Sequence, residues 1–385
     1  MDEWVDALRA PAGQAVLRRA AALPLTDASL LSDLATLRRE QPDELVTAAV
    51  RLTRLRRRGR AKFSRADVMW LTRPGLEQAS SELVARHRAQ RYASAGAVAD
   101  LCCGIGGDLV ALAERTTVLG VDRDPLHVRL ARLNAEACGA SEGVEVRCDD
   151  VTATTLRGCP AVFVDPARRR DGRRLPAGSS DPPLKWCLDL IERVPAVGVK
   201  CAPGIDRALV PAAWELECVA VGRELKEARL WSPALADGPR RATVLPGGES
   251  LTPVPGERVG VAPPGAYVVD PSPAVTRSGL VQDLARQLGA WQLDPELAML
   301  SVATPVATPF GRTLRVLDSL PWSLKALRRS LRRLDIGTVD VRKRGSAVDV
   351  DALRHRLALE GSLQATVVLT RLTGRPWALV GADVA

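Results

Sequence analysis

The chain has 385 residues, of which 54 are Lys or Arg and 45 are Asp or Glu, so its formal net charge at pH 7 is +9. Hydrophobic residues make up 46% and charged residues 26%, which excludes a disordered or fibrous protein, and the length predicts two or three domains. The first residues lack the basic and apolar parts of a signal peptide, and no stretch of about 18 residues is free of charge. We therefore expect a cytoplasmic protein that does not span a membrane.

Residues 1–92 are predicted to form a helical N-terminal domain. Apolar residues recur at three- and four-residue spacings after Pro42, as at Leu45, Ala49 and Leu52. The same segment carries a basic series that continues beyond the predicted helix, namely Arg51, Arg54, Arg58, Arg60, Lys62 and Arg65. This series is consistent either with a solvated helix face or with contact to nucleic acid.

Residues 93–250 alternate short apolar runs with helix-length segments, which is typical of a parallel sheet with crossover helices. We expect an α/β, Rossmann-like, doubly wound sheet of seven strands, of which the last two form a late hairpin. The expected strands are 98–101, 117–121, 144–147, 161–164, 196–200, 217–221 and 241–245.

Residues 260–385 are predicted to form a separate α+β domain. The preceding segment, 246–265, is dense in Pro and Gly, which indicates a boundary or an exposed connection. The expected strands are 266–269, 313–317, 339–342 and 364–372, and the expected helices are 280–288, 324–334 and 352–359.

The eight cysteines form no Cys-x-x-Cys pair and show no Cys/His spacing suited to zinc. We therefore expect free thiols and no metal site.

A glycine-rich loop follows the first predicted strand, in the run Asp100-Leu-Cys102-Cys-Gly104-Ile-Gly106-Gly-Asp. Glycines let the backbone turn tightly and approach a ligand closely. The loop lacks the third glycine of a dinucleotide-binding fingerprint, which disfavours a nicotinamide cofactor. Acids also follow the second and third predicted strands, at Asp122 and Asp150.

These motifs resemble those of class I S-adenosylmethionine-dependent methyltransferases. The resemblance implies that Asp100 and the loop, including Cys102, Gly104 and Gly106, hold the methionine part of S-adenosylmethionine. It further implies that Asp122 receives the ribose hydroxyls and that Asp150 accepts from the adenine amino group, with Asp149 as the alternative if the register shifts by one. Cys102 replaces the usual first glycine, as in the similar loop of trimethylguanosine synthases and related RNA methyltransferases.

Asp165 and Pro166 end the fourth predicted strand, where the resemblance implies the acceptor site. Their position matches the Asp/Asn-Pro-Pro-aromatic motif of amino-methylating members, in which the carboxylate and the proline carbonyl accept both protons of the target amine. Two positions depart from that motif, because Ala167 replaces the second proline and Arg168 replaces the aromatic residue. Phe163, Trp186 or an arginine plane are alternatives for stacking on the base.

Asp-Pro-Ala-Arg also resembles a motif of uracil-5 RNA methyltransferases, in which a cysteine adds to C6 of the pyrimidine. Cys201, at the end of the fifth strand, is the candidate nucleophile for this alternative. No His lies nearby in the sequence, and Ala202 stands where those enzymes have Asn.

Further basic residues lie near the predicted acceptor site. Arg168 and Arg169 begin an arginine-rich loop, and Lys200 ends the fifth strand, so all three are candidates for binding the substrate. A solvated surface loop is the alternative.

The order of parts along the chain resembles a bacterial family of class I methyltransferases with a C-terminal THUMP-like domain. The motifs outside the core are 72–79, 224–227 and 377–381. The resemblance implies an RNA partner, tRNA or rRNA, and a basic cluster at Lys325, Arg328, Arg329, Arg332, Arg333 and 342–344 agrees with it. Our leading hypothesis is an enzyme that methylates a base nitrogen in RNA; the alternatives are an RNA-binding protein with a relic pocket and a methyltransferase acting on protein or a small molecule.

Overall fold

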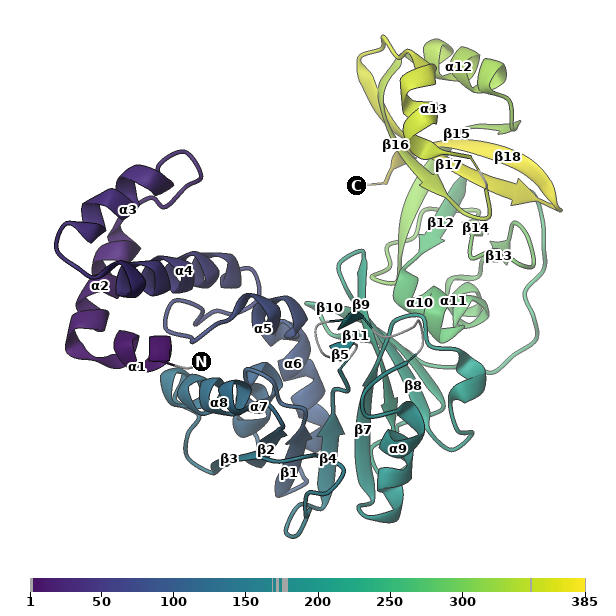
Figure 1. Cartoon of the computed structure of the whole chain (residues 1–385). Helices are drawn as coiled ribbons and strands as arrows, with labels where there is room; N and C mark the ends of the chain where they lie inside the picture. The colour runs from purple at the N-terminus through teal and green to yellow at the C-terminus, as the bar shows by residue number, and fades with distance from the viewer. Residues whose placement is uncertain (1–2, 168, 171–172, 175–178, 347, 385) are drawn as a thin grey trace. The chain divides into compact units, whose positions relative to one another are not determined.

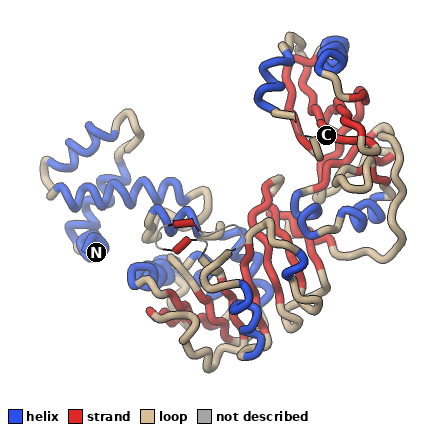
Figure 2. Tube along the Cα trace, turned by 45° about the vertical axis from the view of Figure 1, so that its right-hand side comes forward, coloured by secondary structure: helices blue, strands red, loops and turns tan. Residues whose placement is uncertain are grey.

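The computed structural model describes residues 3–167, 169–170, 173–174, 179–346 and 348–384. The chain divides into two compact units, of which the first comprises Met1–Cys201 with Leu230–Ala236 and the second comprises Ala202–Arg229 with Asp237–Ala385. Figures 1 and 2 trace the chain through both. Each unit is described in turn.

The described part of residues 1–92 contains helices and turns and no strand, which confirms the expected helical N-terminal region (Figure 2). The long helix α4 contacts α1, α2 and α3, and its buried side chains, such as Val46, Ala49 and Leu52, follow the spacing that the sequence showed. The elements are α1 (Glu3–Arg9), α2 (Pro11–Ala22), α3 (Leu30–Arg38), α4 (Asp43–Gly59), α5 (Arg73–Gln78), α6 (Glu82–Ala89) and the 3-10 turn η1 (Gln90–Tyr92).

Several residues of the basic series in this region contact other parts of the chain. Arg54 pairs with Asp27 at 2.6 Å and Arg60 with Asp67 at 2.9 Å. Lys62 donates to the carbonyls of Leu76, Glu77 and Ala79, which end helix α5, at 2.8, 3.2 and 2.7 Å, and Arg65 donates to the carbonyl of Cys138 at 3.2 Å. Lys62 therefore holds the end of helix α5, whereas Arg60 and Arg65 are exposed, which agrees with the solvated face that the sequence allows.

The sheet of the first unit positions the candidate site. Its strands run in the order β7-β4-β1-β2-β3, and each neighbouring pair is parallel. Because the strands are parallel, their carboxyl ends lie along one edge. The strands are β1 (Ala97–Leu101), β2 (Thr117–Asp122), β3 (Val144–Cys148), β4 (Ala161–Val164) and β7 (Ala196–Cys201), and the helices between them are α7 (Gly107–Ala113), α8 (Pro125–Cys138) and α9 (Leu184–Asp189), followed by the 3-10 turn η2 (Leu190–Glu192).

The complete sheet has nine strands, in the order β11-β10-β8-β9-β7-β4-β1-β2-β3. All seven expected strands are present, and β9 and β11 are additional. The elements that follow β7 are the 3-10 turn η3 (Arg207–Leu209), β8 (Glu215–Val221), β9 (Glu224–Trp231), β10 (Arg240–Leu245) and β11 (Glu249–Leu251).

The late hairpin expected between 217–221 and 241–245 is wrong, because β8 and β10 pair in parallel. A parallel pair needs a crossover, and strand β9 lies within it. Strand β9 follows β8 after two residues, Gly222 and Arg223, and Gly222 takes the left-handed φ of +54° that such a turn favours. The tight turn therefore joins β8 to β9.

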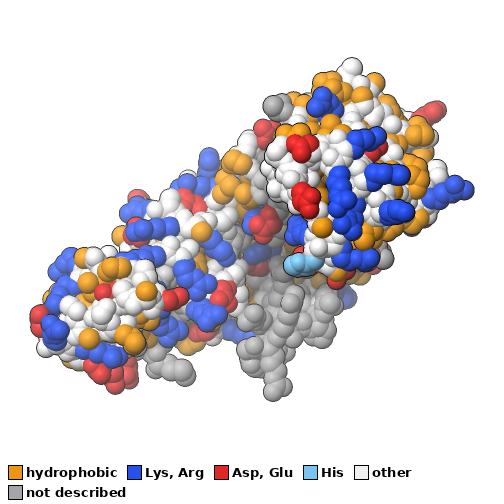
Figure 3. All heavy atoms as spheres, turned by 90° about the horizontal axis from the view of Figure 1, so that it is seen from above, with side chains coloured by type: hydrophobic (Ala, Val, Ile, Leu, Met, Phe, Trp, Pro, Cys, Tyr) orange, Lys and Arg blue, Asp and Glu red, His pale blue; other side chains and the backbone are white. Residues whose placement is uncertain are grey.

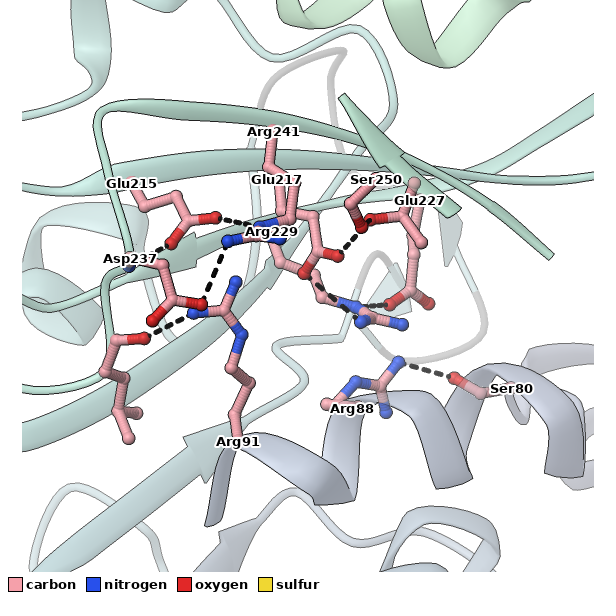
Figure 4. A network of polar contacts seen from close by, with 12 residues as sticks. Ser80, Arg88, Arg91, Glu215, Glu217, Glu227, Arg229, Asp237, Arg241 and Ser250 are labelled. Atoms are coloured by element: carbon pink, nitrogen blue, oxygen red, sulfur yellow. Dashed lines mark hydrogen bonds and ion pairs between the residues drawn. The ribbon is translucent and has the colours of Figure 1, made fainter. Parts of the chain in front are cut away.

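Strand β9 was missed because charged residues occupy its buried positions. Arg229 is 1% exposed and pairs with Glu227 and, at 3.4 Å, with Glu217, both of which are also buried (Figure 4). Thr243 donates its hydroxyl to Glu217 at 2.7 Å. A hydrophobic pattern cannot reveal a strand whose interior side chains are ion-paired.

A second sheet lies at the C-terminal end of the chain, as the α+β expectation requires. Its order is β13-β14-β12-β15-β18-β17-β16, and helices α12 and α13 pack on β15 and β16. The expected strands and helices are all present. The elements are β12 (Tyr267–Pro271), α10 (Pro273–Ser278), α11 (Val281–Leu288), β13 (Trp291–Gln292), β14 (Leu300–Val302), β15 (Gly311–Pro321), α12 (Leu324–Arg333), β16 (Ile336–Lys343), α13 (Val350–Leu357), β17 (Leu363–Leu372) and β18 (Arg375–Asp383).

Candidate active site

The glycine loop connects β1 to α7 through three residues with left-handed backbone. Cys102, Gly104 and Gly106 have φ of +62°, +55° and +83°. A Cβ atom on Gly106 would lie 3.1 Å from the Cα of Ala131, so glycine is required there for helix α8 to pack closely. Cys102 has the left-handed backbone conformation that glycine adopts more easily. The cysteine that replaces the usual first glycine of the loop is therefore strained.

Asp100, at the end of β1, has an unusual environment. Its side chain is 1% exposed, and neither carboxylate oxygen has a hydrogen-bond partner among the described residues. Burial, with the neighbouring Asp108 carboxylate as a further cause, raises the pKa of Asp100 well above its ordinary value. A buried carboxylate without a donor is incomplete, and a cationic or hydrogen-bonding ligand group would complete it.

Asp122, at the end of β2, is held in place by three contacts. Its oxygens accept from the backbone N–H groups of Gly104 and Asp124, both at 2.9 Å, and Nδ1 of His127 lies 3.5 Å from Oδ1. Burial acts to raise the pKa of Asp122, but the hydrogen bonds outweigh it and lower this pKa. The hydrogen bond with Asp122 raises the pKa of His127. Asp122 is therefore an oriented carboxylate beside the glycine loop.

Asp150 and Asp149 follow β3, and the structure distinguishes them. Asp150 is exposed in the cavity described next and accepts through Oδ1 from the backbone N–H and hydroxyl of Thr152, at 2.8 and 2.7 Å. These bonds lower the pKa of Asp150. Asp149 does not line that cavity and lines a shallower one near α8.

A cavity of about 920 Å³ brings the predicted residues together. Its lining includes Asp100, Cys102, Gly104, Asp122, Asp150, Asp165, Pro166 and Lys200. Gly106 shapes the loop without lining the cavity. The N-terminal helical region contributes a wall through Arg51 and residues 72–79, of which Thr72, Pro74, Gly75, Glu77, Gln78 and Ala79 line the cavity.

The predicted acceptor carboxylate, Asp165, lies beside a lysine. Nζ of Lys200 is 2.5 Å from Oδ2 of Asp165 and 3.1 Å from the hydroxyl oxygen of Ser80. The side chain of Lys200 is 9% exposed and that of Asp165 is 28% exposed. Burial raises the pKa of Asp165, and the Lys200 ammonium acts in the opposite direction.

The other acceptor-site predictions have different outcomes. Cys201 is buried and is not among the described residues that line the cavity. Phe163 is fully buried with the Arg88 guanidinium 4.3 Å from its ring centre, and Trp186 does not line the cavity, so neither presents a stacking face there. Arg168 lies outside the described residues. Arg169 begins the short strand β5 (Arg169–Arg170), which pairs with β6 (Arg173–Arg174), and only its backbone is described.

Three buried residues that support the site without lining the cavity were not predicted from the sequence, namely Ser80, Arg88 and the chain's only asparagine, Asn134. Asn134 accepts from the N–H of Trp70 at 2.6 Å and donates to the carbonyls of Trp70 and Ile105 at 3.0 and 2.8 Å. It therefore connects the segment before α5 to the glycine loop. A lone Asn in a hydrophobic helix was the available signal, because a buried amide needs partners.

Comparison with known proteins decides the family. An uncharacterized S-adenosylmethionine-dependent methyltransferase of Mycobacterium tuberculosis is 39% identical over 336 residues, which cover 84% of this chain and 92% of that relative, in both strain CDC 1551 and strain H37Rv. The chain belongs to the S-adenosylmethionine-dependent methyltransferases. Its cofactor is therefore S-adenosylmethionine.

The fold of this methyltransferase has a solved counterpart. A crystal structure from Porphyromonas gingivalis W83, of a protein described as a methyltransferase, covers 96% of this chain and 98% of that chain, with a TM-score of 0.76 and 20% identity. At that identity the likeness concerns the fold alone.

Three family profiles match parts of this methyltransferase. They are described as RNA cap guanine-N2 methyltransferase at residues 95–165, THUMP domain-like at 311–383 and a domain of unknown function at 3–59. Within the described residues, no helix is long and apolar enough to cross a membrane, and no group of three His, Cys, Asp or Glu side chains is arranged to hold a metal ion.

Proposed function

We propose that this methyltransferase transfers the methyl group of S-adenosylmethionine to a base nitrogen in RNA. The observation that carries the proposal is the common cavity of Asp165 and Pro166 with Asp100, Asp122 and Asp150. A cavity of about 920 Å³ has room for a cofactor and part of an acceptor.

The chemistry of the site fits the cofactor. The unpartnered Asp100 carboxylate and the Gly104 backbone would hold the methionine part, Asp122 would receive the ribose hydroxyls, and Asp150 would accept from the adenine amino group. S-adenosylmethionine supplies an electrophilic methyl group when it is bound. The strained loop at Cys102 and Gly104 leaves the backbone open toward the cavity, because nothing lies within 4 Å of where a Cβ on Gly104 would be.

The acceptor side fits a nitrogen that carries hydrogen. Asp165 and Pro166 both line the cavity, and the Asp165 carboxylate and the Pro166 carbonyl would together bind both protons of an exocyclic amine. Such binding orients the nitrogen lone pair toward the methyl group without a strong base. The buried position of Cys201 gives no support to the C5-pyrimidine alternative.

Two features support RNA as the carrier of that nitrogen. The THUMP domain-like match covers residues 311–383, and the profile over 95–165 describes RNA cap guanine-N2 methyltransferases. Lys and Arg side chains gather on the right-hand part of the face shown in Figure 3, with Asp and Glu side chains among them. In helix α12, Lys325, Arg329 and Arg332 are exposed and have no ion-pair partner in the described part of the chain.

Mass spectrometry of RNA nucleosides tests the proposal. Total RNA from a deletion strain should lack one methylated nucleoside that its parent contains, and the wild-type gene should restore it. The Asp165→Ala variant should not restore it, whereas Asp149→Ala, outside the cavity, should. An unchanged nucleoside profile in the deletion strain would reject RNA as substrate. Calorimetric titration with S-adenosylmethionine would then separate the two remaining alternatives. Binding is expected if the enzyme has a different substrate, and no binding is expected if the pocket is a relic.

A further inference from the structure

A buried polar network connects the acceptor carboxylate to the N-terminal helical region. Lys200 contacts Asp165 and Ser80. Nη2 of Arg88 donates to the same Ser80 hydroxyl at 3.1 Å (Figure 4). Arg88 also forms an ion pair with Asp108 in the first turn of α7. Both Ser80 and Arg88 are buried, at 8% and 1% exposure. The network therefore joins α6, α7, β4 and β7.

The position of Lys200 follows from the sheet. Strands β4 and β7 are parallel neighbours, so Asp165, directly after β4, lies beside Lys200 near the end of β7. Ser80 precedes α6 and accepts from two cations through one oxygen. A lysine side chain normally has great rotational freedom, and contacts at both Ser80 and Asp165 remove it.

We propose that Lys200 is a positioning residue for Asp165: held by Ser80, its ammonium keeps Asp165 ionised and in one orientation, so that the acceptor must donate a hydrogen bond to it. This inference rests on the proposed function of Asp165. An ionised carboxylate only accepts hydrogen bonds, so the substrate group that contacts Asp165 must donate one from nitrogen or oxygen. An exocyclic amine meets this requirement.

The electrostatics of the described residues agree with this role. The pKa of Asp165 is raised overall, because burial and the Asp108 carboxylate outweigh the opposing charges of Lys200 and Arg88. Burial and nearby carboxylates, that of Asp165 among them, also raise the pKa values of Asp100 and Cys102. Without the Lys200 charge, burial and the Asp108 carboxylate would still act on Asp165. The pKa of Asp165 would therefore rise further, and its protonated form would persist to higher pH.

The test compares Lys200→Met and Lys200→Arg with the wild-type full chain. Carbon-13 NMR of labelled Asp carboxyls, with the Asp165 signal assigned by Asp165→Asn, should give a higher titration midpoint in Lys200→Met and a near-normal one in Lys200→Arg. With total RNA from a deletion strain as substrate, kcat/KM at neutral pH should fall about tenfold or more in Lys200→Met, and the acidic limb of its pH profile should move to higher pH. The exposed Lys185→Met on α9 is the matched control and should change neither readout.

The outcomes separate this inference from the proposed function. A titration midpoint of Asp165 that does not depend on Lys200 overturns the inference, even if RNA is methylated. A dependent midpoint without RNA methylation supports the role of Lys200 and rejects the substrate. If Lys200→Met fails to fold, Ser80→Ala is the second test, because it removes the other contact of the Lys200 ammonium. It should shift the titration midpoint and kcat/KM in the same direction by a smaller amount. If neither quantity shifts in Ser80→Ala, the inference is overturned.

Discussion

At the residue scale, the cavity lining distinguishes Asp150, which lines the cavity, from its neighbour Asp149, which does not. Both hydrogen bonds from Thr152 use Oδ1 of Asp150, so Oδ2 remains for a donor from a ligand. Asp149 points elsewhere, because its Oδ1 accepts from the N–H of Asp150 and it does not line the cavity. The sequence alone left this choice open, since a shift of one residue exchanges the two side chains.

We expect Asp150→Ala to weaken the binding of S-adenosylmethionine about tenfold or more, because a hydrogen bond to a charged group contributes about 1.5–3 kcal/mol. Asp149→Ala is the matched control and should change the Kd by less than about threefold. Isothermal titration calorimetry measures both. A larger effect of Asp149→Ala would reverse the assignment.

His127 should make stability depend on pH. Its pKa is raised in the folded protein by Asp122, so its contribution is fully present below the unfolded pKa of about 6.5 and disappears as pH rises through the folded value. His127→Gln should therefore lower the free energy of unfolding by about 0.5–1 kcal/mol more near pH 5.5 than near pH 8.5. Urea unfolding at the two pH values measures this difference, with exposed His355→Gln as the control; an equal loss at both pH values would contradict the assigned contact.

At the element scale, β9 illustrates what pattern analysis misses. The five strands β1, β2, β3, β4 and β7 were predicted within two residues of their ends, because four of them are largely apolar runs and β3 alternates apolar with charged residues. In contrast, β9 contains Glu227 and Arg229 at buried positions, and it appears as a polar connection in the sequence. The false hairpin between β8 and β10 followed from missing it.

We expect Arg229→Met to destabilise the protein by about 3–5 kcal/mol, because it leaves the buried carboxylates of Glu217 and Glu227 without their cation. Combining it with Glu217→Gln and Glu227→Gln should recover part of the loss. Chemical denaturation followed by circular dichroism gives both values. A single variant that loses less than about 1 kcal/mol would show that the ion pairs contribute little to the stability of this sheet.

At the scale of the whole molecule, the order of parts agrees with the sequence. A helical region, a methyltransferase sheet and a THUMP-like α+β part follow one another, although the boundaries 1–92, 93–250 and 260–385 remain predictions. The cations behind the +9 net charge differ in their contacts. Several residues of the basic series at 54–65 form ion pairs or hydrogen bonds within the chain, whereas helix α12 has exposed cations.

The exposed cations of α12 should determine the salt dependence of RNA binding. Replacing Lys325, Arg329 and Arg332 by Ala should make the slope of log K against log salt less negative by about 2, since each contact to a single-stranded phosphate contributes about 0.7. Fluorescence anisotropy with total tRNA over a salt series measures the slope. Exposed Arg115→Ala, in the turn between α7 and β2, is the control, and an unchanged slope in the α12 variant would place RNA binding elsewhere.

The sequence by itself determined the elements and residues that local pattern encodes. Strand, glycine loop and acid follow one another within a few residues at Asp100 to Gly106, so their spacing is visible without a structure. The tertiary structure decided which distant side chains meet: Lys200 reaches Asp165 across 35 residues and Ser80 across 120, and residues 72–79 form a cavity wall. Such contacts arise from strand order and helix packing, because parallel neighbours need not be consecutive in the chain.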